Sequence, residues 1–254
     1  MALHFNSDSG TDDYLSKSTA IFSGHTYPLA FSVWVRPDDT GSQHAVVSDS
    51  GNGSSKQIRL GCTGGGKFQV GTKGKNVNSG SVYYSNGNTT WFHLAGLWIA
   101  SNNMKLYVNG ELDGSTTSNN NISNFADSNI FYIGTGVSSG TNIASKTWEG
   151  GLADVAAYAG ELTEADILSL SKGFSPLLVR PSALVGYWPL GGPYAPTTID
   201  PVGNNTLTAN GGPSNEAHPR IIYPTSPPVI MASAQQSKVA SIMLQHNQYA
   251  GGVI

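Results

Sequence analysis

The acidic residues are the first side chains to consider for chemistry, because two carboxylates at a fixed separation can hydrolyse a glycosidic bond. Such a pair usually projects from one face of a strand at alternating positions, and no Glu-x-Asp-x-x-Glu set or similar pattern occurs in the sequence. The acids fall instead on the predicted helix or in stretches typical of loops, as at Asp8, Asp12, Asp13, Asp38, Asp39, Asp49 and Asp113. The sequence therefore predicts a protein that is not an enzyme.

One of these loops carries oxygen ligands that suit a hard cation. Calcium prefers several carboxylate and carbonyl oxygens, and Asp8, Asp12 and Asp13 could supply them from a single turn. A solvated turn without a metal is the alternative interpretation of the same residues. Calcium is the one cofactor that the sequence leaves open, and no other cofactor is predicted.

Aromatic and amide side chains in another loop could bind a sugar. An exposed ring buries the apolar face of a pyranose, while nearby polar side chains bind its hydroxyl groups. Tyr83 and Tyr84 lie in the Asn- and Ser-rich segment 76–88, with Asn86 beside them. We predict a ligand site at these three residues, although single exposed aromatics are also common on proteins that bind no sugar.

The elements that must position these loops are short strands. Leu29, Phe31, Val33 and Val35 alternate with other residues and therefore share one face of a strand that Pro37 ends. A denser apolar stretch at 91–99 predicts a central strand covered on both faces. Further short strands are expected at 45–48, 57–61, 67–71, 130–134, 152–158 and 184–190. The most apolar of these strands should place three tryptophans in the core, at Trp34, Trp98 and Trp188.

Two local motifs predict a hairpin and a helix. Asn109-Gly110 follows a strand at 104–108 and tolerates the positive φ angles of a type I′ turn. Thr163 is a typical N-cap with Asp166 at the N3 position, and Gly173 is a typical helix end. We expect this helix to connect strands rather than to form a packing layer.

Composition excludes several classes of partner. The chain has 31 glycines and 13 prolines, which favours strands and tight turns over helices, and its formal net charge of −3 gives no electrostatic footprint for nucleic acid. No apolar run is long enough to cross a bilayer, and the N-terminal residues resemble no export signal, so we expect neither membrane insertion nor secretion. Cys62 is alone, which excludes an intrachain disulfide.

The last part of the chain differs from the rest. Prolines recur from Pro176 onward, so we expect a β-sandwich over residues 1–190 and a Pro-rich segment at 191–228 that wraps over it. Residues 229–254 are almost uncharged and are predicted to be an assembly arm. Its apolar residues should contact a partner chain, and they are Val239, Ile242, Met243 and Leu244.

Five motifs occur here in the order found in laminin-G-like jelly-roll domains of the concanavalin A-like type: Phe31 to Pro37, Trp91 to Gly96, Leu106 to Gly110, Ile133-Gly134, and Gly151 to Tyr158 with the helix that follows. The chain resembles this family over roughly residues 1–190. Three later stretches resemble laminin-G-like proteins of tailed bacteriophages, namely Gly173 to Leu178, Leu184 to Leu190 and His218 to Pro224.

The family resemblance implies an all-β fold, a two-sheet antiparallel jelly-roll sandwich, here with one short helix and a Pro-rich C-terminal extension. Members often bind glycans or a protein partner, sometimes with calcium. The strand that holds Asp154 commonly carries a second acid in the family, where this chain has Ala153. Asp154 is the candidate calcium ligand that remains on that strand.

The phage-like stretches imply a non-enzymatic virion protein. We expect a capsid decoration or cement protein, made in the host cytoplasm and displayed on the virion surface, with capsid protein and other copies of itself as partners. The alternative is a carbohydrate-binding tail fibre or adhesin domain that recognises host surface glycans. Long fibrous repeats would favour a fibre, and the sequence contains none.

Overall fold

The computed structural model describes residues 2–7, 12–41, 44–51, 57–72, 74–118, 128–138, 141–143, 147–191 and 198–224. The chain divides into two compact units, Met1–Ile222 and Tyr223–Ile254. The predicted assembly residues lie outside the described residues, and they are Val239, Ile242, Met243 and Leu244. Within the described part of the chain, no helix combines the length and apolar character that a membrane span requires.

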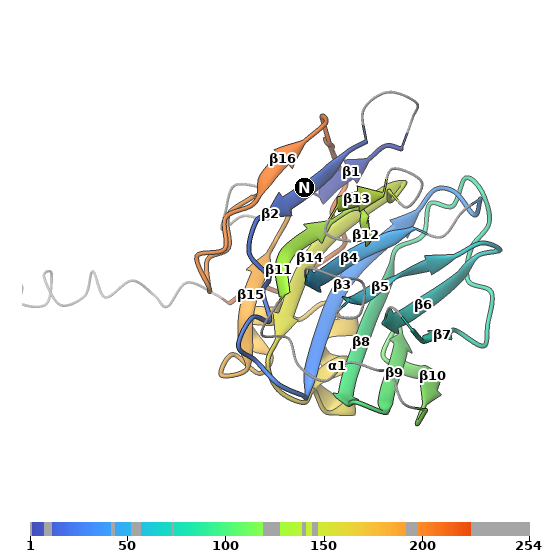
Figure 1. Cartoon of the computed structure of the whole chain (residues 1–254). Coiled ribbons are helices and arrows are strands. Elements are labelled where there is room, and N and C mark those ends of the chain that lie inside the picture. Colours follow the sequence, from blue (N-terminus) through green and yellow to red (C-terminus); the bar gives the residue numbers. More distant parts are fainter. Residues whose placement is uncertain are drawn as a thin grey trace, which may run out of the picture. The chain divides into compact units, whose positions relative to one another are not determined.

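Two antiparallel sheets form the first unit (Figure 1). Sheet A runs in the order β10 (Glu111–Thr116), β9 (Asn103–Val108), β8 (Phe92–Ala100), β3 (Leu29–Pro37), β14 (Gly150–Tyr158), β1 (Ala2–Phe5) and β17 (Ser214–Glu216), and β15 (Leu184–Trp188) also pairs with β14. Sheet B runs in the order β16 (Thr208–Asn210), β2 (Tyr14–Lys17), β11 (Ser128–Ile133), β4 (Ala45–Gly51), β5 (Gln57–Thr63), β6 (Lys67–Thr72) and β7 (Asn76–Asn78). A separate pair consists of β12 (Gly136–Ser138) and β13 (Thr141–Ile143).

The core lies between the inner faces of the two sheets, and the predicted all-β sandwich is confirmed. The four alternating residues of β3 that were expected to share a face are all in this core, namely Leu29, Phe31, Val33 and Val35. Trp98 and Trp188 are fully buried there, as predicted. Phe131 of sheet B stacks on Trp188 of sheet A with 4.8 Å between ring centroids, so aromatic contacts join the sheets.

The hairpin prediction is also confirmed. Asn109 and Gly110 both have positive φ angles, 52° and 92°, and they join β9 to β10. The Asn109 side chain adds a second constraint, because its Oδ1 accepts a hydrogen bond from the backbone N–H of His93 at 2.9 Å. The turn is therefore tied to β8 as well as to its own two strands.

Helix α1 (Glu164–Ser171) begins at the predicted N-cap, and both hydrogen bonds between Thr163 and Asp166 form. The expectation that this helix only connects strands is wrong. Ile167 and Leu170 are buried in a second apolar cluster between the helix and the outer face of sheet A, with Tyr107 of β9. Sheet A is therefore covered on both faces, by sheet B and by the layer that contains α1 and the short 3-10 helix η2 (Pro176–Leu178).

The Pro-rich segment differs from the prediction because it belongs to the sandwich. Its residues form β16, which pairs with β2 in sheet B, and β17, which pairs with β1 in sheet A. Asp200 closes the open edge of β15, since its Oδ1 accepts the N–H of Tyr187 at 3.0 Å. The compact unit therefore extends to Ile222, and residue 190 is not a domain boundary. Strands of three residues fit between the prolines, which is why periodicity did not reveal them.

Candidate functional site

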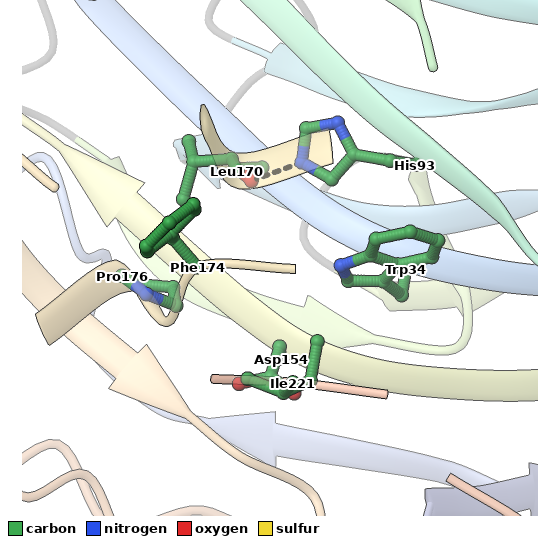
Figure 2. Close-up of a pocket in the computed structure, with 8 residues that line it drawn as sticks. Trp34, His93, Asp154, Leu170, Phe174, Pro176 and Ile221 are labelled. Carbon is green, nitrogen blue, oxygen red and sulfur yellow. Dashed lines mark hydrogen bonds between the residues drawn. The ribbon is translucent and has the colours of Figure 1, made fainter. Parts of the chain in front are cut away.

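A small hollow lies on the outer face of sheet A beneath the helix layer (Figure 2). Its lining comes from β3, β8, β14, α1, the segment after α1 and the segment after β17. The lining residues are Ser32, Trp34, His93, Asp154, Leu170, Phe174, Pro176 and Ile221. The prediction that Trp34 belongs to the core is therefore wrong. Trp34 alternates with the core residues of β3, is half-buried on the outer face, and packs edge-on against His93 with 5.5 Å between ring centroids.

The hollow contains a serine and a histidine in contact. Ser32 Oγ lies 2.9 Å from His93 Nε2, and both side chains are buried. Burial lowers the pKa of His93 to about 3, so the imidazole is neutral and can accept the serine proton. A nucleophile and base of this kind also need access for a substrate and a third group that orients the imidazole. Ser32 is only 2% exposed, so the contact has a packing role.

Asp154 does not act on that histidine. A β-bulge between Ala153 and Ala156 gives Asp154 a positive φ of 49°. The Tyr187 hydroxyl donates a hydrogen bond to Asp154 Oδ1, and His218 Nε2 lies 2.9 Å from Asp154 Oδ2 in an ion-pair contact. Asp154 therefore joins β14, β15 and the segment that follows β17.

The predicted calcium ligands are not gathered at one place. Asp13 is buried and accepts hydrogen bonds from the N–H of Asn6 at 3.0 Å and of Gly212 at 2.6 Å, so it holds two backbone segments together. Asp12 is half-exposed, and Asp8 lies outside the described residues. Among the residues that the structure describes, no group of three or more His, Cys, Asp or Glu side chains could hold a metal ion. Calcium binding by the aspartate loop stays a prediction.

The tyrosine site must be corrected at Tyr84. Its side chain is only 6% exposed, and its ring packs against Phe68 with 5.3 Å between centroids, so it presents no face to a sugar. Tyr83 is half-buried between Phe68 and Phe92. The Tyr83 hydroxyl donates to Asp113 Oδ2 at 2.7 Å, which fixes the ring against β10.

Asn86 is exposed, as a ligand-binding residue must be. Its Oδ1 accepts hydrogen bonds from the backbone N–H of Thr40 at 2.8 Å and from the Thr40 hydroxyl at 2.6 Å. These bonds join two loops and leave the amide nitrogen of Asn86 to solvent. The loop therefore offers one amide and the edge of one tyrosine, which is less than a sugar site usually requires.

A more extensive polar surface lies on the outer face of sheet B. The strand register places one outward position of each strand in a single transverse row, which we call the polar row: Asn76, Gly71, Arg59, Ser48, Tyr132, Ser16 and Thr208. Ser48 and Tyr132 in the middle of the row are buried, whereas Asn76 at its β7 end is exposed. The accessible part of the row therefore lies toward β5, β6 and β7.

At that end, amide and guanidinium side chains contact one another across three strands. This β5–β7 cluster consists of Gln57, Arg59, Gln69, Asn76 and Asn78. Arg59 Nη2 donates to Asn76 Oδ1 at 2.8 Å, and Gln69 Nε2 donates to Asn78 Oδ1 at 2.7 Å. Gln57 and Gln69 are buried, whereas Asn76 and Asn78 are exposed and keep further donor or acceptor capacity, so the cluster can bind sugar hydroxyl groups from its β7 side.

Comparison with known sequences agrees with this architecture. The sequence profile of the Concanavalin A-like lectin/glucanases superfamily matches residues 9–168, well over half of the chain. The chain belongs to this superfamily. No curated protein matches the sequence.

Several solved structures have a similar fold at low sequence identity. A heptameric SAP-like pentraxin from Limulus polyphemus is 13% identical, with a TM-score of 0.58 over 84% of this chain and 93% of the pentraxin. A Bacteroides ovatus protein proposed to bind carbohydrate is 20% identical, with a TM-score of 0.55 over 83% of this chain and 58% of that protein. The CBM40 domain of the Ruminococcus gnavus IT-sialidase is 12% identical, with a TM-score of 0.50 over 67% of this chain and 98% of the domain. At these identities the similarity concerns the fold alone.

The β5–β7 cluster was not predicted from the sequence. Its members occupy every second position of three strands whose apolar residues had already been assigned to the core, for example Arg59 between Ile58 and Leu60. The signal that could have revealed the cluster is that the alternate positions of these strands are polar but include no acid. An ordinary solvated sheet face would also carry acids. Only the register could show that they meet in one row.

Proposed function

We propose that this protein is a non-catalytic carbohydrate-binding module and that it binds glycan at the β5–β7 cluster. The observation that carries the proposal is the continuous set of amide and guanidinium side chains on the outer face of sheet B, aligned by the strand register. Amides bind sugar hydroxyls through paired donor and acceptor groups, and a sheet holds them at fixed spacing.

The alternative surface is less suitable for this purpose. The outer face of sheet A is covered by α1 and η2, and Ser32 and His93 in the hollow beneath them are buried. It contains one carboxylate, Asp154, which already contacts Tyr187 and His218. A glycosidase would need a second carboxylate opposite the first, so this arrangement supports a binding protein rather than a hydrolase.

Membership of a lectin and glucanase superfamily supports the same proposal. Two of the similar structures are described by their carbohydrate interactions, the Bacteroides ovatus protein and the Ruminococcus gnavus CBM40 domain. The identities are too low to transfer a ligand from either protein. They make glycans the first ligands to test.

The test is a glycan array probed with the native protein and two variants. The double variant Asn76→Ala, Asn78→Ala removes two exposed amides from the cluster, and we expect it to lower the array signal at least about tenfold, since each lost hydrogen bond contributes roughly 1 kcal/mol. Asn86→Ala removes an exposed amide outside the cluster and should leave the signal unchanged. A native protein that binds no glycan would refute the proposal, and a loss confined to Asn86→Ala would move the site to the loop.

We propose a second role, display on a bacteriophage virion as a decoration protein that contacts capsid protein and other copies of this chain. It rests on the three stretches that resemble laminin-G-like proteins of tailed bacteriophages. Two of the phage-like stretches, distant in sequence, meet in the structure, where Phe174 and Ile222 form a parallel bridge. Ser175 N donates to the Ile222 carbonyl at 2.9 Å, and Ile222 N donates to the Gly173 carbonyl at 2.6 Å. The stretches thus behave as one structural unit that ends the sandwich.

Deleting residues 229–254 tests this second proposal. The sandwich is compact up to Ile222, so the truncated protein should remain folded and soluble with a nearly unchanged melting curve. It should fail to attach to particles in cryo-electron micrographs of the virion. Attachment of the truncated protein at native occupancy would show that residues 229–254 are not the assembly arm.

A further inference from the structure

Arg59 is a cation whose contacts within the described part of the chain include no acid. Its Nη2 donates to Asn76 Oδ1 at 2.8 Å and its Nη1 to Gln57 Oε1 at 3.4 Å, and both acceptors are neutral amides. Among the described residues no carboxylate forms an ion pair with it. Arg36 and Arg180 differ, since Arg36 is paired with Asp38 and Glu216, and Arg180 with Asp166.

The absence of a counter-charge has an energetic consequence. Arg59 is half-buried, and burial lowers its pKa because desolvation disfavours the charged form. No neighbouring acid offsets this effect, unlike at Arg36, where Glu216 and Asp38 raise the pKa. A partly buried cation without an anion is destabilising, and an anion that reached it would relieve that cost.

The rest of the face has the same sign of charge. The outward side chains of sheet B that the structure describes include two cations and no carboxylate, and they are Tyr14, Ser16, Ala45, Ser48, Ser50, Gln57, Arg59, Thr63, Lys67, Gln69, Asn76, Asn78, Ile130, Tyr132, Thr208 and Asn210. The protein as a whole has a formal net charge of −3. This face is therefore locally positive on an acidic protein, which favours the approach of an anion.

The neighbours of Arg59 leave its guanidinium accessible from the face. In the register, Arg59 lies between Gly71 and Ser48, so it has no bulky neighbour on either adjoining strand. Asn76 reaches across Gly71, since a Cβ at Gly71 would lie 2.3 Å from Asn76 Oδ1. A guanidinium has five N–H donors, and the bonds to Gln57 and Asn76 leave three for a ligand.

We infer that the glycan bound at the β5–β7 cluster is anionic and that Arg59 binds its carboxylate or sulfate group. This inference rests on the proposed function, because it names the class of glycan for the same site. A guanidinium fork matches the two oxygens of a carboxylate or sulfate, and Asn76 holds one arm of that fork in place. The exposed flanking amide of Asn78 then binds neutral hydroxyls of the same sugar chain.

The experiment compares matched ligands that differ only in charge. Calorimetric dissociation constants are measured for tetragalacturonate and its methyl ester, and for the sulfated and unsulfated forms of one neutral tetrasaccharide. The native protein should bind at least one anionic form at least tenfold more tightly than its neutral partner. Arg59→Gln should lose that preference, and Arg59→Lys should keep only part of it because a lysine ammonium lacks the fork. Arg180→Gln, which removes an arginine outside this face, should bind as the native protein does.

The outcomes separate this inference from the proposed function. Binding to neutral and anionic forms with equal affinity, or a charge preference that survives in a folded Arg59→Gln protein, would overturn the role of Arg59 and leave glycan binding intact. Failure to bind any of these ligands or any array glycan would overturn both. Preference for the carboxylate pair or for the sulfate pair, lost in Arg59→Gln, would support the inference and identify the group. Thermal melting of each variant checks that it is folded.

Discussion

The Asp49 carboxylate accepts a hydrogen bond from the backbone N–H of Phe22 at 2.8 Å, inside the sandwich. Asp49 belongs to β4 but points inward, opposite the core residues Ile58 and Phe131. Burial raises the pKa of Asp49 to about 7, and hydrogen bonds from backbone N–H groups oppose that rise. The residue thus anchors a loop at the cost of placing a carboxyl group in the core.

Asp49 should make the protein less stable as the pH rises. The unfolded chain releases this proton near the ordinary value of 3.8, whereas the folded protein releases it near 7, so between these values the folded state binds more protons. The free energy of unfolding should fall by up to about 1.4 kcal/mol per pH unit in that window from this group. In Asp49→Asn this contribution should vanish, as urea denaturation from pH 4 to pH 8 would measure. An unchanged pH profile in the variant would contradict a buried, protonated Asp49.

His93 should have the opposite effect. Burial lowers its pKa from the ordinary 6.5 to about 3, so the unfolded chain binds a proton that the folded protein does not. Stability from this group is present above pH 6.5 and is lost as the pH falls toward 3. Between about pH 4 and 6.5 the contributions of Asp49 and His93 to the free energy of unfolding therefore oppose each other and should largely cancel. In His93→Gln the free energy of unfolding should fall as the pH rises, because only the Asp49 contribution remains. In Asp49→Asn it should rise with pH, because only the His93 contribution remains. The same pH dependence in both variants and the native protein would refute this compensation.

Gly110→Val should destabilise the hairpin. The φ of 92° is unfavourable for a β-branched residue, and a Cβ at this position would lie 2.6 Å from Ser171 Oγ and 3.1 Å from Leu168 Cδ1. Strain of this kind typically costs about 1–3 kcal/mol, so the melting temperature should fall by several degrees. Gly65→Val is a matched control for the φ strain alone, because Gly65 has φ +85 with no atom near its Cβ. A smaller loss at position 110 than at position 65 would argue against the helix contact.

Asp154→Ala should lower stability through the loss of two contacts. The Tyr187 hydroxyl would lose its acceptor and His218 its carboxylate, and an unsatisfied buried polar group typically costs about 1–3 kcal/mol. Asp154→Asn keeps an acceptor for Tyr187 and tolerates the left-handed backbone, so it should cost less. Equilibrium denaturation of both variants would measure the difference, and equal losses would mean that the backbone bulge, rather than the contacts, sets the stability.

Much of the fold could be predicted because its signals are local. The alternation of Leu29, Phe31, Val33 and Val35 indicates a strand with one buried face, and Asn109-Gly110 indicates a turn with two positive φ angles. The Thr163 and Asp166 pair indicates where a helix begins. Each of these depends on residues within a few positions of one another, so the chain carries the information without its tertiary contacts.

The failures have a different physical origin. Tyr84 was expected at the surface because its neighbours are polar, and Trp34 in the core because its strand is apolar. Burial depends on what lies above a residue in space: Phe68 covers Tyr84, while α1 and its following segment only partly cover Trp34. The residues next to a side chain in sequence do not show which face of the sheet another element will cover.

The binding face shows the same division. The residue types at alternate positions of β5, β6 and β7 are determined by the sequence, as is the capacity of Arg59 to bind an anion. That Arg59 faces Asn76 across Gly71, and that no described carboxylate reaches it, follow from the register of separate strands. Register is decided by the burial of the whole inner face of a sheet, because a shift of one residue would move every core side chain to solvent.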